Sequence, residues 1–222
     1  DAAYRFPPSA ALKANLRNPL IVPREWQGET AIIVGGGRSI TDLGQDKILP
    51  HFEGRYPIIA CNSSFLLVPS CEVLFGADHR WWNENKWNIG RHLGFWKITR
   101  RPLSGKQPYP VHYVRTEHKG GLSLDPVFVH GRNSGHVAIN LAVHFGASRL
   151  ILVGFDMRSW EKGQQNWHTL HSRPANVDAF ETWISDLTFA KPTLEKAGVT
   201  VLNANPSSAV RCFSFCDLED FL

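Results

Sequence analysis

Short runs of consecutive apolar residues, separated by glycine-rich or polar turns, recur along the chain. The clearest runs are Thr30–Val34, Pro57–Cys61, Glu72–Gly76, Arg149–Gly154 and Val199–Asn203. Continuous apolar runs of this length, rich in β-branched residues, are typical of strands that are buried on both faces of a parallel sheet. We therefore predict that these five runs form strands of the core.

Helical patterns fall between the strands. A helical stretch is expected after Gly35–Ser39, through about Leu49, and a long helix is expected from about Val177 to Ala197, kinked at Pro192. A third helix follows Gly131–Gly135, with apolar residues at three- and four-residue spacing: Val137, Ala138, Leu141, Ala142 and Phe145. Gly146 is its expected C-cap. Alternation of strands and helices predicts a Rossmann-like α/β fold, with a mainly parallel sheet covered by helices on both faces.

The 222 residues fit one domain. We expect a loosely structured N-terminal lead-in over 1–29 and a single nucleotide-binding domain over 30–222. Within it, the segment 87–125 is rich in Gly, Pro, Arg and Lys and is expected to be an irregular insertion or lid. Weak strand patterns occur only at Val111–Val114 and Val127–Val129.

Composition narrows the function classes. With 43% hydrophobic and 20% charged residues the chain is a globular protein, not a disordered or fibrous one. It has no apolar stretch of about 18 residues and no signal-like N-terminus, which predicts no membrane association and a cytoplasmic location. The net charge of +4 allows phosphate-bearing partners but is too small to indicate a nucleic-acid binder.

The cysteines have one expected role, whereas the tryptophans have two alternative roles. The four cysteines form no CxxC pair and are expected to be reduced structural thiols: Cys61, Cys71, Cys212 and Cys216. Six tryptophans lie in polar, loop-like contexts: Trp81, Trp82, Trp87, Trp96, Trp160 and Trp167. Rings in such contexts either line a ligand site or cover hydrophobic surface, and the sequence favours neither.

Small and polar residues gather at the predicted carboxyl ends of the strands, where open α/β sheets bind ligands. They are Gly35, Gly36, Gly37, Arg38, Ser39, Asn62, Ser63, Asp78, Arg132, Asn133, Ser134, Gly135 and Asp156. Glycines and a helix N-terminus suit a phosphate or nucleotide, although the first loop matches neither GxGxxG nor a P-loop. A tight turn for the glycines, and a helix N-cap for the Arg132–Gly135 segment, are the simpler alternatives.

Two loop histidines add candidate chemistry. His168 and His171 follow Trp167, and either imidazole has a pKa suited to a general base, although loop histidines are more often surface residues. Asp156 ends the strongest strand, where it could bind a metal, orient a hydroxyl or cap the turn. A zinc site built from the histidines lacks a third ligand unless Asp156 or His79 joins, so we predict no metal site.

These residues together resemble a known superfamily. The segments AIIVGGGRSI, IIACNSSF and GRNSGHVAINLAVHFGASRLILVGFDM are similar to the small Rossmann-type bacterial sialyltransferases that use CMP-sialic acid. They are also similar to DUF115 proteins, which include 6-hydroxymethylpterin pyrophosphokinases. Segments Asp78–Trp82, Trp167–Pro174 and Val201–Ala209 extend the likeness, most closely to uncharacterised phage-encoded members, for which the location would be the host cytoplasm.

The sialyltransferase resemblance implies specific roles. Gly35–Ser39, Asn62 and Asn133–Gly135 would contact a cytidine nucleotide, and His168, or else His171, would be the general base, with no metal required. The chain departs from the family in its first loop, Gly36–Ser39 in place of Asn-Gly-Pro-Ser. It also lacks a tyrosine after Asp156, so Arg38, Arg132 or Arg158 would have to stabilise the leaving phosphate.

Two other functions stay open. The pyrophosphokinase resemblance implies Mg²⁺ held by Asp78 and Asp156. A non-catalytic nucleotide-binding protein would keep the fold without the chemistry. In the leading interpretation the partner is a nucleotide or nucleotide-sugar, and the acceptor is a glycan, a small molecule or DNA. The basic residues between Arg91 and Lys119 would either guide a nucleic-acid acceptor or form a solvated lid.

Overall fold

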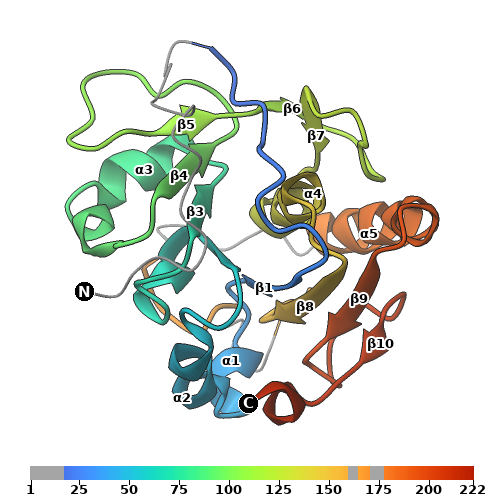
Figure 1. Ribbon diagram of the computed structural model, residues 1–222. Coiled ribbons are helices and arrows are strands. Elements are labelled where there is room, and N and C mark those ends of the chain that lie inside the picture. Colours follow the sequence, from blue (N-terminus) through green and yellow to red (C-terminus); the bar gives the residue numbers. More distant parts are fainter. Residues whose placement is uncertain (1–17, 160–164, 171–177) are drawn as a thin grey trace.

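The computed structural model describes residues 18–159, 165–170 and 178–222. Its main feature is an eight-stranded sheet in the order β10-β9-β8-β1-β2-β3-β4-β5, with every pair parallel (Figure 1). The strands are β1 (Thr30–Val34), β2 (Ile58–Cys61), β3 (Val73–Gly76), β4 (Trp96–Thr99), β5 (His112–Tyr113), β8 (Arg149–Val153), β9 (Thr200–Asn203) and β10 (Ser214–Phe215). A separate parallel pair joins β6 (Arg115–Glu117) to β7 (Phe128–His130).

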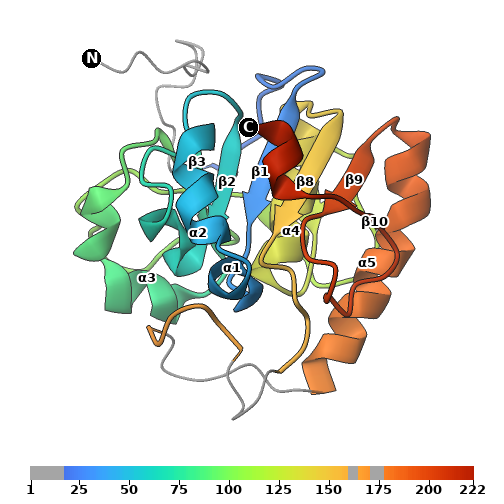
Figure 2. The ribbon, with the colours of Figure 1, turned by 90° about the horizontal axis from the view of Figure 1, so that it is seen from below.

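Helices cover both faces of the sheet. The α-helices are α1 (Ser39–Asp42), α2 (Gln45–Ile48), α3 (His79–Asn85), α4 (Ser134–Phe145) and α5 (Asp178–Lys196). Short 3₁₀ helices are η2 (Leu49–Phe52), η3 (Asn62–Leu66), η4 (Asn88–Arg91) and η6 (Leu218–Phe221). Helices α4 and α5 lie on one side of the sheet, and α1 and α2 lie on the other (Figures 1 and 2).

The central strand β1 shows why the apolar runs are continuous. Ala31 and Ile33 belong to the core cluster that packs against α4 and α5, whereas Ile32 and Val34 belong to the cluster on the opposite face. All four side chains are fully buried. Because each face of the sheet carries a layer of helices, neither half of the alternating side chains contacts water. The predicted Rossmann-like fold is confirmed.

Helix boundaries follow local chemistry. Asn133 caps α4 by accepting the His136 amide at 2.9 Å, and Gly146, with a φ of 101°, ends the helix in the left-handed conformation. Helix α5 contains Pro192, as expected. The single helix expected after the first loop is instead broken into α1 and α2, because Gly44 adopts a left-handed φ of 68° between them.

The segment 87–125 differs from the expected irregular lid. Strands β4 and β5 belong to it, and they extend the main sheet at one edge. The sequence conceals β4 because the buried strand includes Lys97, whose ammonium group donates to the carbonyls of His92 and Gly94 at 3.4 and 3.2 Å. Because these carbonyl oxygens accept hydrogen bonds from its ammonium group, the lysine can occupy a buried strand position.

The described part of the expected lead-in also packs against the domain. Trp26 is fully buried and stacks on Phe145 of α4, with ring centroids 4.1 Å apart. Its amide donates to the Phe145 carbonyl at 2.8 Å. Residues 18–29 therefore cover the end of α4, which the irregular sequence pattern before Thr30 did not indicate.

Three of the six tryptophans in polar contexts are structural core residues. Trp81, Trp82 and Trp96 are buried, Trp87 is 80% exposed, and Trp160 lies outside the described residues. All four cysteines are free thiols, as expected. Among the described helices, none combines the length and the apolar character that crossing a bilayer requires.

His92 is a buried titratable group beside β4. Its ring nitrogen Nε2 lies 2.8 Å from the Cys71 carbonyl oxygen, a contact that requires the nitrogen to carry a proton and donate. Burial, and then the positive charge of Lys97, lower the pKa of His92 to about 3. The folded protein therefore keeps this imidazole neutral in mildly acidic solution.

We predict that His92 makes the fold sensitive to acid. Below pH 6.5 the unfolded chain binds a proton at His92, whereas the folded chain does not. The free energy of unfolding therefore decreases as the pH is lowered, until about pH 3. The loss is about 1.4 kcal/mol per pH unit, or about 2 kcal/mol between pH 7 and pH 5. Urea denaturation at both pH values measures it. His92→Gln keeps an N–H donor and should lose about 2 kcal/mol less than the wild type, whereas exposed His51→Gln should match the wild type.

Candidate active site

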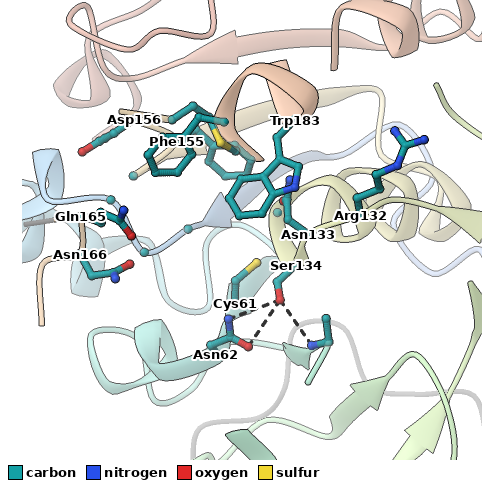
Figure 3. A pocket seen from close by; sticks show the side chains of 18 of the residues that line it. Cys61, Asn62, Arg132, Asn133, Ser134, Phe155, Asp156, Gln165, Asn166 and Trp183 are labelled. Carbon is teal, nitrogen blue, oxygen red and sulfur yellow. Dashed lines mark hydrogen bonds between the residues drawn. The ribbon is translucent and has the colours of Figure 1, made fainter. Parts of the chain in front are cut away.

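A cleft of about 400 Å³ lies at the carboxyl ends of the strands (Figure 3). The chain runs outward from β1 through β2 to β5 and then returns to place β8 on the other side of β1. The cleft forms where this order reverses, which is the usual ligand site of such sheets. Its lining comprises Gly35–Gly37, Cys61, Asn62, Ala77, Asp78, Arg100, Arg132–Gly135, Gly154–Arg158, Gln165, Asn166, Phe180 and Trp183.

The first loop of the cleft packs directly on the loop after β8. The Gly37 amide donates to the Gly154 carbonyl at 2.9 Å. A Cβ atom on Gly37 would lie 2.6 Å from that carbonyl oxygen and 2.5 Å from the Asp156 carboxyl group. Glycine is needed because the two backbones approach this closely, and the same lack of side chains leaves the floor of the cleft as bare backbone.

Asp156 joins three segments beneath this floor. Its buried carboxylate accepts hydrogen bonds from the Ser39 amide at 2.9 Å, the Ser39 hydroxyl, and the Asn205 side-chain amide at 2.8 Å. These hydrogen bonds join distant segments, a structural role that differs from the three roles considered for Asp156, and a catalytic role stays a prediction. Ser39 is buried by the same contacts and does not line the cleft.

Polar groups from the starts of η3 and α4 meet on the opposite wall. The Asn62 side-chain amide donates to the Ser134 hydroxyl at 3.3 Å, and the Ala77 amide donates to the same oxygen at 3.4 Å. Asn62 reaches this position because its backbone adopts a left-handed φ of 53°. The Nδ2 atom of Asn133 is buried with no hydrogen-bond partner among the described residues. These groups and the first amides of α4 offer donors to an anion or a ribose.

Three residues predicted for the nucleotide lie away from the cleft. Ser39 is bound to Asp156, and the Ser63 hydroxyl accepts the indole N–H of Trp81 at 3.1 Å. Arg38 forms an ion pair with Asp42, one helical turn further along the chain, at 3.1 Å. The other predicted nucleotide-binding residues line the cleft together: Gly35, Gly36, Gly37, Asn62, Asp78, Arg132, Asn133, Ser134 and Gly135.

Neither of the two predicted histidines is found among the described residues that line the cleft. The His168 ring stacks edge-on against Trp167, with centroids 4.7 Å apart, and its Nδ1 accepts the Leu170 amide at 3.1 Å. His168 is not among the residues that line the cleft, and His171 lies outside the described residues. The segment 165–170 is nevertheless tied to the first loop, because the Trp167 amide donates to the Gly36 carbonyl at 3.1 Å. The role of His168 as a general base therefore stays a prediction.

Arg100, which follows β4, lines the cleft but was not among the site residues predicted from the sequence. Its guanidinium contacts the Asp78 carboxylate at 3.3 Å and the Nε2 atom of His118 at 2.9 Å. Since a guanidinium only donates, Nε2 accepts and the imidazole is neutral. Burial, and then Arg100, Arg101 and Arg132, lower the pKa of His118, consistent with that form. The sequence shows that Arg100 belongs to a basic segment, but nothing in the sequence distinguishes Arg100 from the neighbouring basic residues.

Aromatic side chains of α5 form another part of the wall that the sequence did not reveal. Phe180 and Trp183 pack edge to face, with centroids 5.6 Å apart, and both line the cleft. Figure 3 shows the Trp183 indole on the same side of the cleft as Asn133 and Ser134. Such a surface suits the flat face of a base or a sugar.

The charges in the cleft favour an anionic ligand. Guanidinium groups of Arg100, Arg132 and Arg158 come from three different loops and line the cleft together with the carboxylates of Asp78 and Asp156. Arg132 is itself paired with Asp186 of α5. Several guanidinium groups beside a helix N-terminus bind phosphate well. Among the described residues, no group of three or more His, Cys, Asp or Glu side chains is arranged to hold a metal ion.

Comparison with known proteins supports the fold class. The chain matches no protein-family model and no curated protein. Two solved structures share the fold, both with 13% sequence identity. A MAf glycosyltransferase from Magnetospirillum magneticum superposes with a TM-score of 0.60 over 86% of this chain. The matched region is 34% of the length of that glycosyltransferase. The sialyltransferase CstII from Campylobacter jejuni, solved with cytidine-5'-monophosphate (CMP), has a TM-score of 0.54 over 85% of each chain.

We predict that Gly37→Ala destabilises the protein by about 1–3 kcal/mol, because its methyl group would displace the Gly154 backbone rather than a movable side chain. Gly90→Ala is the matched control: a Cβ there meets nothing within 4 Å, and the change should stay within about 0.5 kcal/mol. Urea denaturation of both variants measures the free energies of unfolding. Equal stability of the two variants would contradict the close packing of the first loop.

Proposed function

We propose that the chain is a glycosyltransferase that binds a nucleotide-activated sugar in the cleft and transfers the sugar to an acceptor hydroxyl. The observation that carries the proposal is the convergence of bare glycine backbone, the start of α4 and three guanidinium groups at the reversal of the strand order. The shared fold with two glycosyltransferases, one of them solved with CMP, supports a cytidine nucleotide as the donor.

The residues of the cleft have complementary roles in this proposal. The first loop, Asn62 and Ser134 bind the nucleoside and its phosphate, because they combine close backbone approach with hydrogen-bond donors. Arg132 and Arg158 stabilise the negative charge that develops on the departing phosphate, in place of the tyrosines of the sialyltransferases. Fixed positive charge is effective here because it needs little reorganisation during the reaction.

The transfer is a direct displacement. The acceptor oxygen forms a bond to the anomeric carbon while the bond from that carbon to the phosphate oxygen breaks, and the nucleoside monophosphate leaves with both electrons. His168, or alternatively His171, takes the proton of the acceptor hydroxyl. Support for His168 comes from its segment, which is hydrogen-bonded to the first loop through Trp167.

We expect CMP to bind without a metal, with equal affinity in Mg²⁺ and in EDTA by isothermal titration. Asn62→Ala and Ser134→Ala should each weaken binding by about tenfold, the usual effect of losing one hydrogen bond to a ligand. Ser104→Ala, on an exposed loop outside the cleft, should bind as the wild type does. Binding of ATP or GTP only in Mg²⁺ would instead favour pyrophosphoryl transfer.

The general base has a separate test. With CMP-N-acetylneuraminic acid as the donor and water as the acceptor, release of CMP by the His168→Ala variant should fall by about 100-fold. His171→Ala shows whether the second histidine has this role instead, and exposed His51→Ala is the control. If both variants release CMP at the wild-type rate, a histidine base in this segment is excluded.

A further inference from the structure

A second hollow adjoins the cleft. It has a volume of about 610 Å³ and is lined by one face of α5 and by the segments that carry Gly120 and Arg132. Arg132 lines both cavities, and in Figure 3 its guanidinium is directed away from Asn62 and Ser134. The two spaces are thus adjacent, with one arginine side chain at their boundary.

Helix α5 separates the two cavities. Phe180 and Trp183 of its first turns line the cleft, whereas Glu181, Ser185 and Phe189 line the hollow. The latter three are spaced by four residues, so they share one face of the helix. A ligand on this face would lie beside a donor sugar in the cleft without overlapping it.

The chemistry of the hollow suits a saccharide. Phe189 is 69% exposed, and its ring offers an apolar surface to the C–H face of a sugar. Thr182, Ser185 and Glu181 surround it with hydroxyl and carboxylate groups, which accept hydrogen bonds from sugar hydroxyls. An aromatic ring among convergent polar groups is the usual composition of a small-molecule site.

Asp186 provides an independent indication of a ligand. This buried residue also lines the hollow, and one of its carboxylate oxygens accepts from Arg132. The other oxygen, Oδ2, is buried and has no hydrogen-bond partner among the described residues. Buried carboxylate oxygens normally have donors, and a ligand hydroxyl entering the hollow with a small shift of the side chain would provide one.

The charge of the hollow restricts the saccharide. Asp186 neutralises Arg132, which leaves the carboxylate of Glu181 in excess. An anionic sugar would therefore meet a like charge, whereas a neutral or amino-bearing sugar would not.

We propose that this hollow is the acceptor site and that it binds a neutral or amino-bearing saccharide, whose hydroxyl group extends past Arg132 toward the donor. This inference rests on the proposed glycosyltransferase function for its role, but the binding of a saccharide can be measured without turnover.

Saturation-transfer NMR and titration with three defined probes test the proposal. Lactose is neutral, chitosan dimer carries amines, and 3'-sialyllactose is anionic. Lactose or the chitosan dimer should bind, and the sialylated sugar should bind at least about tenfold more weakly than lactose. Phe189→Ala should weaken binding of the favoured sugar by about fivefold or more, and Glu181→Gln should reduce the preference against the anionic probe. Glu195→Gln, on the same helix outside the hollow, is the control.

Titration of CMP on the same variants separates this proposal from the proposed function. Phe189→Ala and Glu181→Gln should leave CMP binding unchanged, because neither residue lines the cleft. Saccharide binding that is lost in Phe189→Ala would support the hollow even if no nucleotide bound. Absence of binding by all three sugars, or equal binding by Phe189→Ala and the wild type, would overturn it.

Discussion

The close contact between the loops that follow β1 and β8 determines the shape of the whole cleft. Gly37 lies on the Gly154 carbonyl with no room for a side chain, and the carboxylate of Asp156 lies directly below. That carboxylate binds Ser39 at the start of α1 and Asn205 after β9, so one buried charge joins three strand ends. Because an ionised group in the interior must keep its donors, these segments hold one relative position.

Much of the fold could be predicted from local patterns. The runs Thr30–Val34 and Arg149–Gly154 are apolar throughout because helices cover both faces of the sheet, and α4 has a cap at each end that the sequence identifies. Strand β4 could not be predicted in this way. Lys97 belongs to a buried strand only because two backbone carbonyls happen to approach its ammonium group, and such carbonyls come from the tertiary structure.

The sequence predicts which loops form the candidate site, but it does not predict which side chains of those loops face the cleft. Strand ends indicate which loops converge, and for that reason Gly35, Asn62 and Ser134 lie together. They do not indicate where each neighbouring side chain points: Ser63 turns to Trp81, while Asn62, one residue earlier, faces the cleft. Arg100 was missed because it follows a buried strand that the sequence conceals, and Trp183 because the orientation of its helix depends on packing.

The two edges of the sheet have a further consequence for how the protein behaves at high concentration. Strands β5 and β10 each have only two residues, so neither edge presents a long row of unpaired backbone groups to a neighbouring molecule. At β5 the Tyr113 carbonyl is already occupied by the Leu20 amide, and at β10 Arg211 lies over the ring of Phe215. An eight-stranded parallel sheet folds slowly and exposes apolar strands on the way, and short, partly covered edges limit the aggregation that such exposure invites.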